Sequence, residues 1–521
     1  MDEDAYINLR IVDQIFAGHG PVFNAGERIE AATSPLWLGV LVVARALFGL
    51  FVRDEWIAVL ASLVAAVLAF VIAGRATRLL HRDEEGVVVP AGLILVAAVA
   101  VVWDFSTSGL EMGLVFLWLA ASWYVLVRVA REDELRTRTR FGFGVIIGLA
   151  PLVRPELTLM MLCFLAAWFV LLRPRRVVFD LVAIFALPFA YQIFRMGYYA
   201  TVVPNTALAK DAGHLYIGQG WAYAKDFIGA YHLWVTGLIF AALLAFRLRA
   251  QRDSRLTIIT AAMVAAAALN AAYIVAIGGD YMHGRLLLPA FFAAALPVSI
   301  SLRKRALVDL SVSGFAGAWA LASVIAFRPP PVDVTTFGVA QISDWRTVSH
   351  AKVVLDDVAL GINGHEAAAA YARGVRGYYL VTDHDPHAAA DPDAFVVTFG
   401  SIGAPAYDAG RRIWVIDIGG LAEPLAARTT AVPGRAAGHR KQVDPAWYTA
   451  RFTAPSPSDS PEVVAARHAL TCAPLADLLQ AVDDDLTPGQ FLSNIWHSVS
   501  FTRLEVPMDP IEAEQRWCPG H

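Results

Sequence analysis

The sequence has few charged residues for its length and almost no net charge. Only 17% of its 521 residues are charged, and the formal net charge is −4. Proteins that bind nucleic acid carry a basic face, so we expect no nucleic-acid partner. The sequence also lacks a Walker phosphate loop, a dinucleotide-binding fingerprint and any zinc-binding spacing of His and Cys. These absences argue against nucleotide-driven chemistry, and the ligand spacing predicts no metal site.

Cysteine is scarce, with three residues in the chain. Cys163 lies in an apolar run, whereas Cys472 and Cys518 lie in a polar C-terminal stretch. Disulfides persist in oxidising compartments. If the C-terminal stretch lies in such a compartment, we expect Cys472 and Cys518 to pair. No cleavable signal peptide is recognisable, because the chain opens with acidic residues instead of basic ones.

Hydrophobic residues, in contrast, are abundant: they make up 57% of the chain, and the mean hydropathy is +0.52. This is too apolar for a soluble domain of this size. A membrane-spanning helix needs about 20 apolar residues, and apolar runs fill the chain between Pro35 and Phe327. The runs are 36–52, 56–78, 87–104, 110–128, 141–153 with 155–172, 177–197, 232–248, 256–277, 286–302 and 306–327. We therefore predict a polytopic α-helical membrane protein.

The composition changes after Arg328, where three prolines follow. Short β-type runs appear at 395–399 and 413–416, separated by polar loops and Pro/Ser-rich stretches. These features predict a soluble C-terminal domain. The predicted parts are a first loop at 1–34, a membrane-spanning domain at 35–328 and a C-terminal α/β domain at 329–521.

The basic residues cluster between the apolar runs, and such clusters mark the cytoplasmic ends of membrane spans. The clusters lie around Arg78, Arg131, Arg176, Arg252 and Lys304. All of them fall on the cytoplasmic side if the chain has ten spans and run 36–52 does not cross. We therefore expect this run, which is short and carries Arg45, to be an interfacial or re-entrant helix. The broken run 141–172 predicts two helices that meet near the outer side.

This arrangement places residues 1–34 and the C-terminal domain on the extracytoplasmic side of the plasma membrane. No span precedes Met1, so we expect that a first transmembrane helix is missing from the start of the chain. An active site on the outer side cannot use cytoplasmic nucleotide sugars. Lipid-phosphate sugars are then the natural activated donors.

The segments predicted to lie outside hold the candidate functional residues. Asp2, Glu3 and Asp4 can act as base or nucleophile, or hold a cation near a phosphate. The simpler interpretation is an exposed, solvated acidic terminus. A compact Gly/Pro-rich loop follows, whose charged residues can bind sugar hydroxyls or pair with one another. The charged residues of this loop are Glu27, Arg28 and Glu30.

Further polar residues lie at the outer ends of later apolar runs. A charge at membrane depth costs roughly 2.5–3.5 kcal/mol, so such residues usually face a cavity and serve a function. The alternative is a salt bridge inside the helix bundle, which we expect for Arg154 and Glu156. Lys210 has no adjacent partner except Asp211, and a cation on the outer side suits a phosphate. The other residues of this group are Glu111, Asn205, Asp280, His283 and Arg285.

Motifs in order along the chain resemble one known family. They are Glu3-Asp4 followed by Ala-Tyr-Ile, then GHGPVFNAGERIEAATSPLW, STSGLEMG, LVRPE, PNTALAK and GGDYMHGR, with GLAEP and GHRK in the C-terminal part. This series resembles the terminal β(1→2) arabinofuranosyltransferases, membrane glycosyltransferases of the C-type fold (GT-C) that build arabinogalactan and lipoarabinomannan. The resemblance covers most of the chain, and GPVFNAGERIEAATS is its most specific part.

The resemblance implies decaprenyl-phosphoryl arabinofuranose as donor, a growing arabinan end as acceptor, and a catalytic acid in the first loop. The acidic pair of the family, usually two Asp, falls here on Glu3 and Asp4. We predict that Asp4 and Glu3 are the catalytic residues: Asp4 deprotonates the attacking hydroxyl or acts as nucleophile, and Glu3 orients sugar hydroxyls or a possible cation. Residues predicted to bind the donor phosphate are Lys210, Arg285 and Asn205, and those predicted to bind sugar are Glu27, Arg28, Glu30, Glu111, Asp280 and His283. No cofactor is assigned, and a divalent cation and the stereochemical course stay open.

Two other functions stay open on the sequence alone. One is a related enzyme that transfers another polyprenyl-linked sugar, such as mannose. The other is a non-enzymatic membrane factor or transporter that keeps only the scaffold. A transporter should show paired interrupted helices in two related halves. Here one interruption is recognisable, near Arg154.

Overall fold

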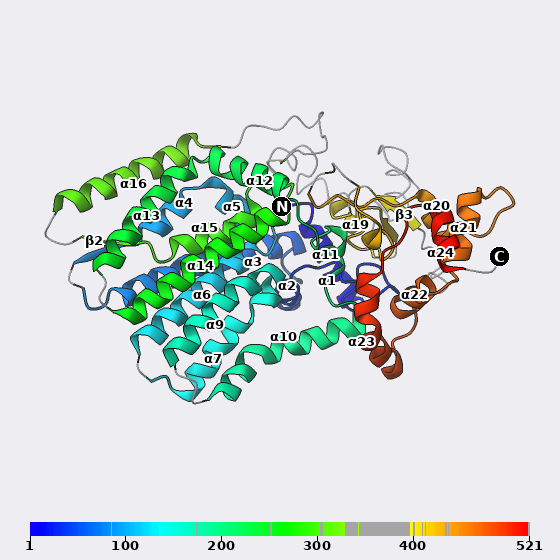
Figure 1. The fold of residues 1–521 in the computed structure, drawn as a ribbon, viewed down its shortest axis with the longest axis horizontal. Coiled ribbons are helices and arrows are strands. Elements are labelled where there is room, and N and C mark those ends of the chain that lie inside the picture. The colour runs from blue at the N-terminus through cyan, green and yellow to red at the C-terminus, as the bar shows by residue number, and fades with distance from the viewer. Residues whose placement is uncertain are drawn as a thin grey trace.

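The computed structural model describes residues 1–328, 342, 396–399 and 402–518, except 85, 133, 173–175, 251–252, 303–305, 409, 412, 433–434 and 436. Figure 1 shows a helical bundle on the left and a smaller C-terminal part on the right. The N-terminal segment lies at the junction between them. The boundary expected at residue 329 lies outside the described residues.

Five long apolar helices can cross a membrane by length and composition. They are α3 (Asp54–Leu80), α6 (Met112–Arg131), α9 (Thr158–Leu172) with the preceding η1 (Pro155–Leu157), α10 (Val177–Tyr199) and α14 (Ser254–Ala276). A sixth candidate is the pair α12 (Ile217–Ala230) and α13 (Leu233–Ala250), which bends by 84°. The chain is therefore a polytopic membrane protein, but the expectation of ten full-length spans was too high for the described residues.

Two of the expected spans are broken into short pieces. Run 87–104 forms β1 (Val87–Val89), α4 (Ala91–Ala97) and α5 (Ala100–Ser106), and run 286–302 forms η2 (Arg285–Leu287), α15 (Leu288–Ala295) and β2 (Ile300–Leu302). The strands β1 and β2 pair antiparallel. A Cβ at Gly92 would lie 2.1 Å from the carbonyl oxygen of Ala295, so only glycine allows this close approach of α4 and α15. Hydropathy alone does not reveal such a pairing.

The remaining helices of the bundle are also short or bounded by breaks. Run 141–172 is interrupted as expected, with η1 and α9 following two shorter helices. The shorter helices are α7 (Thr137–Gly148) and α8 (Ala150–Val153), and the last helix of the bundle is α16 (Ala306–Ala326). Small residues bring the long helices together: a Cβ at Gly113 of α6 would lie 1.9 Å from the carbonyl oxygen of Ser62 in α3.

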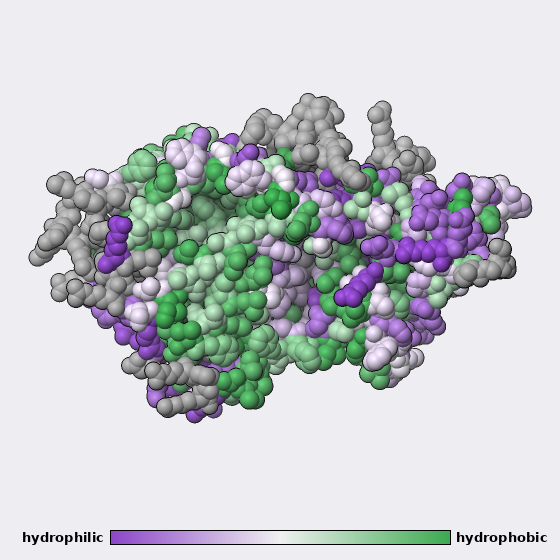
Figure 2. All heavy atoms as spheres, in the orientation of Figure 1, coloured by the Kyte–Doolittle hydropathy of each residue, from purple (hydrophilic) through white to green (hydrophobic). Residues whose placement is uncertain are grey.

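The surface of the bundle is apolar, as expected for a protein that faces lipid. Figure 2 shows hydrophobic residues over the left part of the molecule and hydrophilic residues concentrated on the right. On α10, Val178 and Phe189 are 75% and 66% exposed. Soluble monomers rarely expose continuous apolar surface of this kind.

Residues 1–34 are more ordered than the predicted loop, because they contain helix α1 (Ala5–Phe16). Most of its side chains are buried, including those of Tyr6 and Arg10. Helix α2 (Pro35–Phe48) follows, with the Ser34 hydroxyl accepting the Trp37 amide as its N-cap. Its 14 residues span about 21 Å, less than the roughly 30 Å hydrocarbon core. A short separate helix is confirmed here, and its interfacial position stays a prediction.

The C-terminal part has the predicted α/β character. Strands β3 (Val396–Phe399) and β4 (Trp414–Asp417) pair parallel at the two runs expected from the sequence. Trp414 and Ile416 pack with Trp447 and Phe452 in one apolar core. Among the described residues of this part, the helices are α19 (Ala404–Asp408), η4 (Ala426–Arg428), α20 (Pro445–Phe452), α21 (Pro461–Ala469), α22 (Leu475–Asp483), α23 (Pro488–Arg503) and α24 (Pro510–Trp517).

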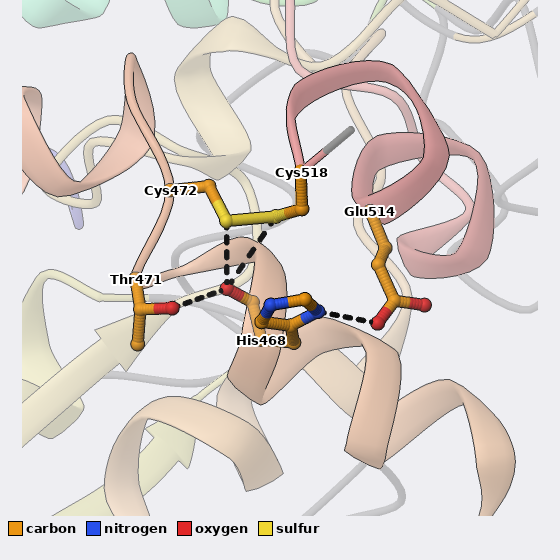
Figure 3. Close-up of a disulfide and its surroundings, with 5 residues drawn as sticks. All are labelled: His468, Thr471, Cys472, Glu514 and Cys518. Carbon is orange, nitrogen blue, oxygen red and sulfur yellow. Dashed lines mark hydrogen bonds and ion pairs between the residues drawn. A yellow bond between two sulfur atoms is a disulfide. The ribbon is translucent and has the colours of Figure 1, made fainter. Parts of the chain in front are cut away.

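The predicted disulfide between Cys472 and Cys518 is confirmed, with the two Cα atoms 5.7 Å apart. Figure 3 shows it beside His468, whose carbonyl oxygen contacts both sulfur atoms and whose ring contacts Glu514. The bridge ties the end of α24 to the segment after α21.

Candidate active site

The three acidic residues at the start of the chain have different surroundings. Asp2 is buried, and its carboxylate accepts the backbone amide of Asp4 at 2.9 Å. Burial, and then the nearby charge of Asp4, raises the pKa of Asp2 to about 8. The Glu3 carboxylate accepts the backbone amide of Gly403 in the C-terminal part. Asp2 and Glu3 therefore hold the segment in place.

Asp4 points toward a cation and a phenol. Its Oδ2 lies 3.3 Å from Nη1 of Arg285, and its Oδ1 lies 3.4 Å from the hydroxyl of Tyr281. Burial raises the pKa of Tyr281 well above its usual value, so the phenol stays neutral and can donate a hydrogen bond. The Asp4 side chain is 17% exposed, compared with 6% for Arg285. Asp4 is thus positioned by its neighbours and still accessible.

The loop between α14 and η2 brings the cation and the phenol to Asp4. Gly278, Gly279 and Gly284 all have positive φ, between 67° and 94°, which lets the chain reverse between the two helices. Arg285 opens η2 and lies 3.7 Å from the Asp280 carboxylate as well as close to Asp4. One guanidinium therefore sits between two carboxylates, both of which belong to the sequence-predicted site.

Glu111 lies at the N-cap of α6 and forms a salt bridge with Arg154, which also pairs with Glu156. The salt bridge expected between Arg154 and Glu156 is therefore present. The guanidinium of Arg154 joins the N-terminal end of α6 to the break between α8 and α9. Glu111 is held at the edge of the site by this pairing.

Lys210 follows helix α11 (Asn205–Ala209) and is half-buried. Within the part of the chain that the structure describes, Lys210 makes no ion pair. Its neighbour Asp211 is engaged elsewhere: it lies 3.3 Å from Nζ of Lys441 and accepts the hydroxyl of Tyr216. The ammonium group of Lys210 is therefore available for a ligand.

Asn205, at the start of α11, is occupied by the C-terminal part. Its amide nitrogen donates to the carbonyl oxygens of Gly420 and Leu421, at 2.7 and 3.2 Å. Its side-chain oxygen accepts from Arg428 at 3.2 Å. The hydrogen bonds of the Asn205 side chain are therefore made with protein groups, and its position does not depend on a donor phosphate.

The charged residues of the first loop are also paired with protein groups. Glu27 lies 2.8 Å from Arg451, and Glu30 lies 2.6 Å from Arg195. Arg28 donates to the carbonyl oxygen of Tyr198 in α10 and to those of Ala481 and Asp484 in the C-terminal part. The loop is thus fastened to α10 and to the C-terminal domain, which accounts for these three side chains without a sugar.

His283 lies in the same loop as Asp280 and Arg285 and is buried. Its Nδ1 faces the Asp226 carboxylate of α12, and its ring contacts Phe227 and Tyr231. Its Nε2 has no hydrogen-bond partner among the described residues. The imidazole is therefore oriented by Asp226 and keeps one nitrogen for a further partner.

The sequence motifs thus converge in part. The structure brings together Asp4, Asp280 and Arg285, and His283 lies in the same loop as Asp280 and Arg285. Lys210 and Asp280 both approach Gly438, and Glu111 lies at the N-terminal end of α6. In contrast, Glu3, Asn205, Glu27, Arg28 and Glu30 fasten segments to one another. Sequence reasoning missed the role of Tyr281, although it lies inside the motif GGDYMHGR. It also missed Arg451, which pairs with Glu27 across more than 400 residues. No local pattern signals such a distant partner.

Among the described residues, one group has the spacing of a metal site, and it consists of His468, Cys472 and Cys518. Both cysteines are oxidised to the disulfide. The group lies in the C-terminal helices at the right of Figure 1, away from the N-terminus. It therefore gives no support for a metal at Asp4, and the question of a divalent cation stays open.

Two curated proteins are similar to the whole chain. Both are called terminal beta-(1->2)-arabinofuranosyltransferase: the protein of Corynebacterium glutamicum is 31% identical over 100% of this chain and 85% of its own, and that of Mycobacterium tuberculosis is 32% identical over 98% and 92%. Residues 375–516 match the AftB family C-terminal domain. No solved structure matches the chain.

Proposed function

Because the chain belongs to the terminal β-(1→2)-arabinofuranosyltransferase family, we propose that it uses decaprenyl-phosphoryl arabinofuranose to extend the arabinan ends of arabinogalactan and lipoarabinomannan. The chain is a glycosyltransferase of the GT-C type and a membrane protein. The observation that carries the proposal is the accessible Asp4 carboxylate beside Arg285, with Lys210 in the same region.

The residues around Asp4 have separate roles in the proposed glycosyl transfer. Asp4 takes the proton of the attacking acceptor hydroxyl or attacks the sugar carbon itself. Arg285 and Lys210 stabilise the negative charge that grows on the lipid phosphate as it leaves. Asp280 and His283 orient sugar hydroxyls, and Tyr281 holds Asp4 through its neutral hydroxyl.

We place the site on the extracytoplasmic side of the plasma membrane. Two observations support this orientation. The disulfide between Cys472 and Cys518 belongs to an oxidising compartment. Basic residues, moreover, follow the C-terminal ends of α3, α6 and α9, whereas Glu111 and Arg154 lie at the N-terminal ends of α6 and of η1 with α9.

Product analysis tests the proposal directly. Purified full-length protein in detergent is given radiolabelled polyprenyl-phosphoryl arabinofuranose and a short arabinofuranoside acceptor with a free 2-hydroxyl. We expect arabinofuranose linked to that hydroxyl in the product. Parallel incubation with polyprenyl-phosphoryl mannose should give no product. Transfer of mannose but not arabinofuranose would overturn the proposed donor.

A further inference from the structure

One motif of the C-terminal domain remains without a role, the segment 437–441 that contains Gly438, His439, Arg440 and Lys441. It passes directly over the site described above. A Cβ at Gly438 would lie 3.7 Å from the ring of Tyr281, 3.9 Å from Cε of Lys210 and 4.0 Å from Oδ1 of Asp280. The backbone of the C-terminal domain therefore forms part of the wall around Asp4.

Two buried cations anchor this segment to the bundle. The guanidinium of Arg440 stacks 3.6 Å from the ring centre of Tyr216 and donates to Gln219 at the start of α12. Lys441 pairs with Asp211 at 3.3 Å and donates to a backbone carbonyl oxygen at 2.6 Å. Both residues are at least nine-tenths buried. Arg440 and Lys441 therefore interact with groups of the protein itself.

His439 differs from Arg440 and Lys441 because it is exposed. Its ring lies edge-on against Tyr281, with the ring centres 4.7 Å apart. The hydroxyl of Tyr281 in turn lies 3.4 Å from Asp4. Tyr281 thus lies between the exposed imidazole and the proposed catalytic carboxylate.

We propose that the segment 437–441 forms one wall of the acceptor subsite and that His439 hydrogen-bonds the hydroxyls of the acceptor glycan. An imidazole can offer both a donor and an acceptor, which suits sugar hydroxyls. The donor carries a lipid, so we expect it to reach Asp4 from the side of the bundle. The C-terminal domain lies beside the bundle in Figure 1 and is the part expected to contact the hydrophilic acceptor glycan. This inference rests on the proposed function.

Steady-state kinetics on the purified full-length protein separate the two substrates. His439→Ala should raise the KM for a synthetic arabinofuranoside disaccharide about tenfold, the effect of losing one good hydrogen bond. The KM for the polyprenyl-phosphoryl donor, kcat at saturating acceptor and the melting temperature should stay unchanged. His439→Gln keeps a donor and an acceptor and should recover part of the affinity. His497→Ala, an exposed histidine of α23, serves as the matched control.

An unchanged acceptor KM in His439→Ala would overturn the inference, and so would a parallel change in both KM values and kcat. Binding of the disaccharide can also be measured by saturation-transfer NMR, which needs no turnover. Weaker binding in His439→Ala than in His497→Ala is the expected result, and equal binding refutes the subsite. Wild-type protein that binds the disaccharide but transfers no arabinofuranose would instead refute the proposed function.

Discussion

Asp2 and Asp4 are two residues apart, yet the fold gives them different chemistry. Asp2 is buried against the bundle, and Asp4 keeps access to solvent beside Arg285. The sequence identified the acidic segment and the cation, because charges in a membrane protein are rare enough to be informative. It did not separate the roles of the carboxylates, since those depend on contacts with Ser108, Gly403 and Tyr281, which are distant in the chain.

The buried Asp2 should make stability depend on pH. Its pKa is raised to about 8 by burial and then by the charge of Asp4, whereas the pKa of an Asp in the unfolded chain is about 4. Between these values the folded state binds the extra proton, so stability is lost as the pH rises from about 4 through about 8. The melting temperature of the wild type in detergent should fall over this range relative to Asp2→Asn, which cannot ionise. If the melting-temperature difference between the wild type and Asp2→Asn does not change with pH, or changes in the opposite direction, the raised pKa of Asp2 is contradicted.

Lys210 should act on the donor alone. Lys210→Ala removes the point charge proposed to contact the lipid phosphate, so the KM for the polyprenyl-phosphoryl donor should rise about tenfold. Lys210→Arg keeps the charge and should lose less. Lys225→Ala, which removes an exposed lysine that stacks on Trp221 of α12, is the matched control. Equal donor KM values for Lys210→Ala and Lys225→Ala would show that Lys210 does not bind the donor phosphate.

At the scale of the element, hydropathy located the long helices within a few residues but overcounted the spans. An apolar run does not show where the chain breaks, and Gly92 beside Ala295 illustrates why: the break depends on a partner about 200 residues away. Helix α1 was missed because polar residues interrupt its apolar pattern. Asn8 and Arg10 are nevertheless buried, and the Arg10 guanidinium donates to the carbonyl oxygen of Ala406 in the C-terminal part.

Helix α2 provides the test of orientation. Leu50, just after α2, is 91% exposed, and Arg82 follows the end of α3. In a Cys163→Ser background, a membrane-impermeant thiol reagent added to intact cells should label Leu50→Cys but not Arg82→Cys. Both should react after the cells are permeabilised. Labelling of Arg82→Cys in intact cells would reverse the proposed orientation.

At the scale of the whole molecule, one arginine joins the first loop to the C-terminal domain. Arg451 of α20 pairs with Glu27, Glu423 and Asp483, at 2.8, 3.0 and 2.9 Å. Arg451→Ala would leave two buried carboxylates, Glu27 and Glu423, without their cation, a change that costs about 3–5 kcal/mol. The variant should melt at a lower temperature and be cut by protease in the C-terminal domain.

The exposed Arg503 of α23 offers the control, since Arg503→Ala should change neither property. Melting of Arg451→Ala at the wild-type temperature would show that the two parts do not depend on this ion cluster. Sequence patterns could define the two parts, but their docking rests on contacts such as Arg451 to Glu27 that no local pattern encodes.

The most direct test of the central claim compares Asp4→Asn with Glu3→Gln in the arabinofuranosyl-transfer assay, using protein with matched expression and melting temperature. Asp4→Asn keeps the shape of the side chain but removes the charge that accepts a proton or attacks carbon. Turnover should fall by roughly 10²–10⁴-fold. Glu3→Gln changes a side chain that accepts the Gly403 amide, so it should retain much more activity. Near-normal turnover by Asp4→Asn would contradict this account.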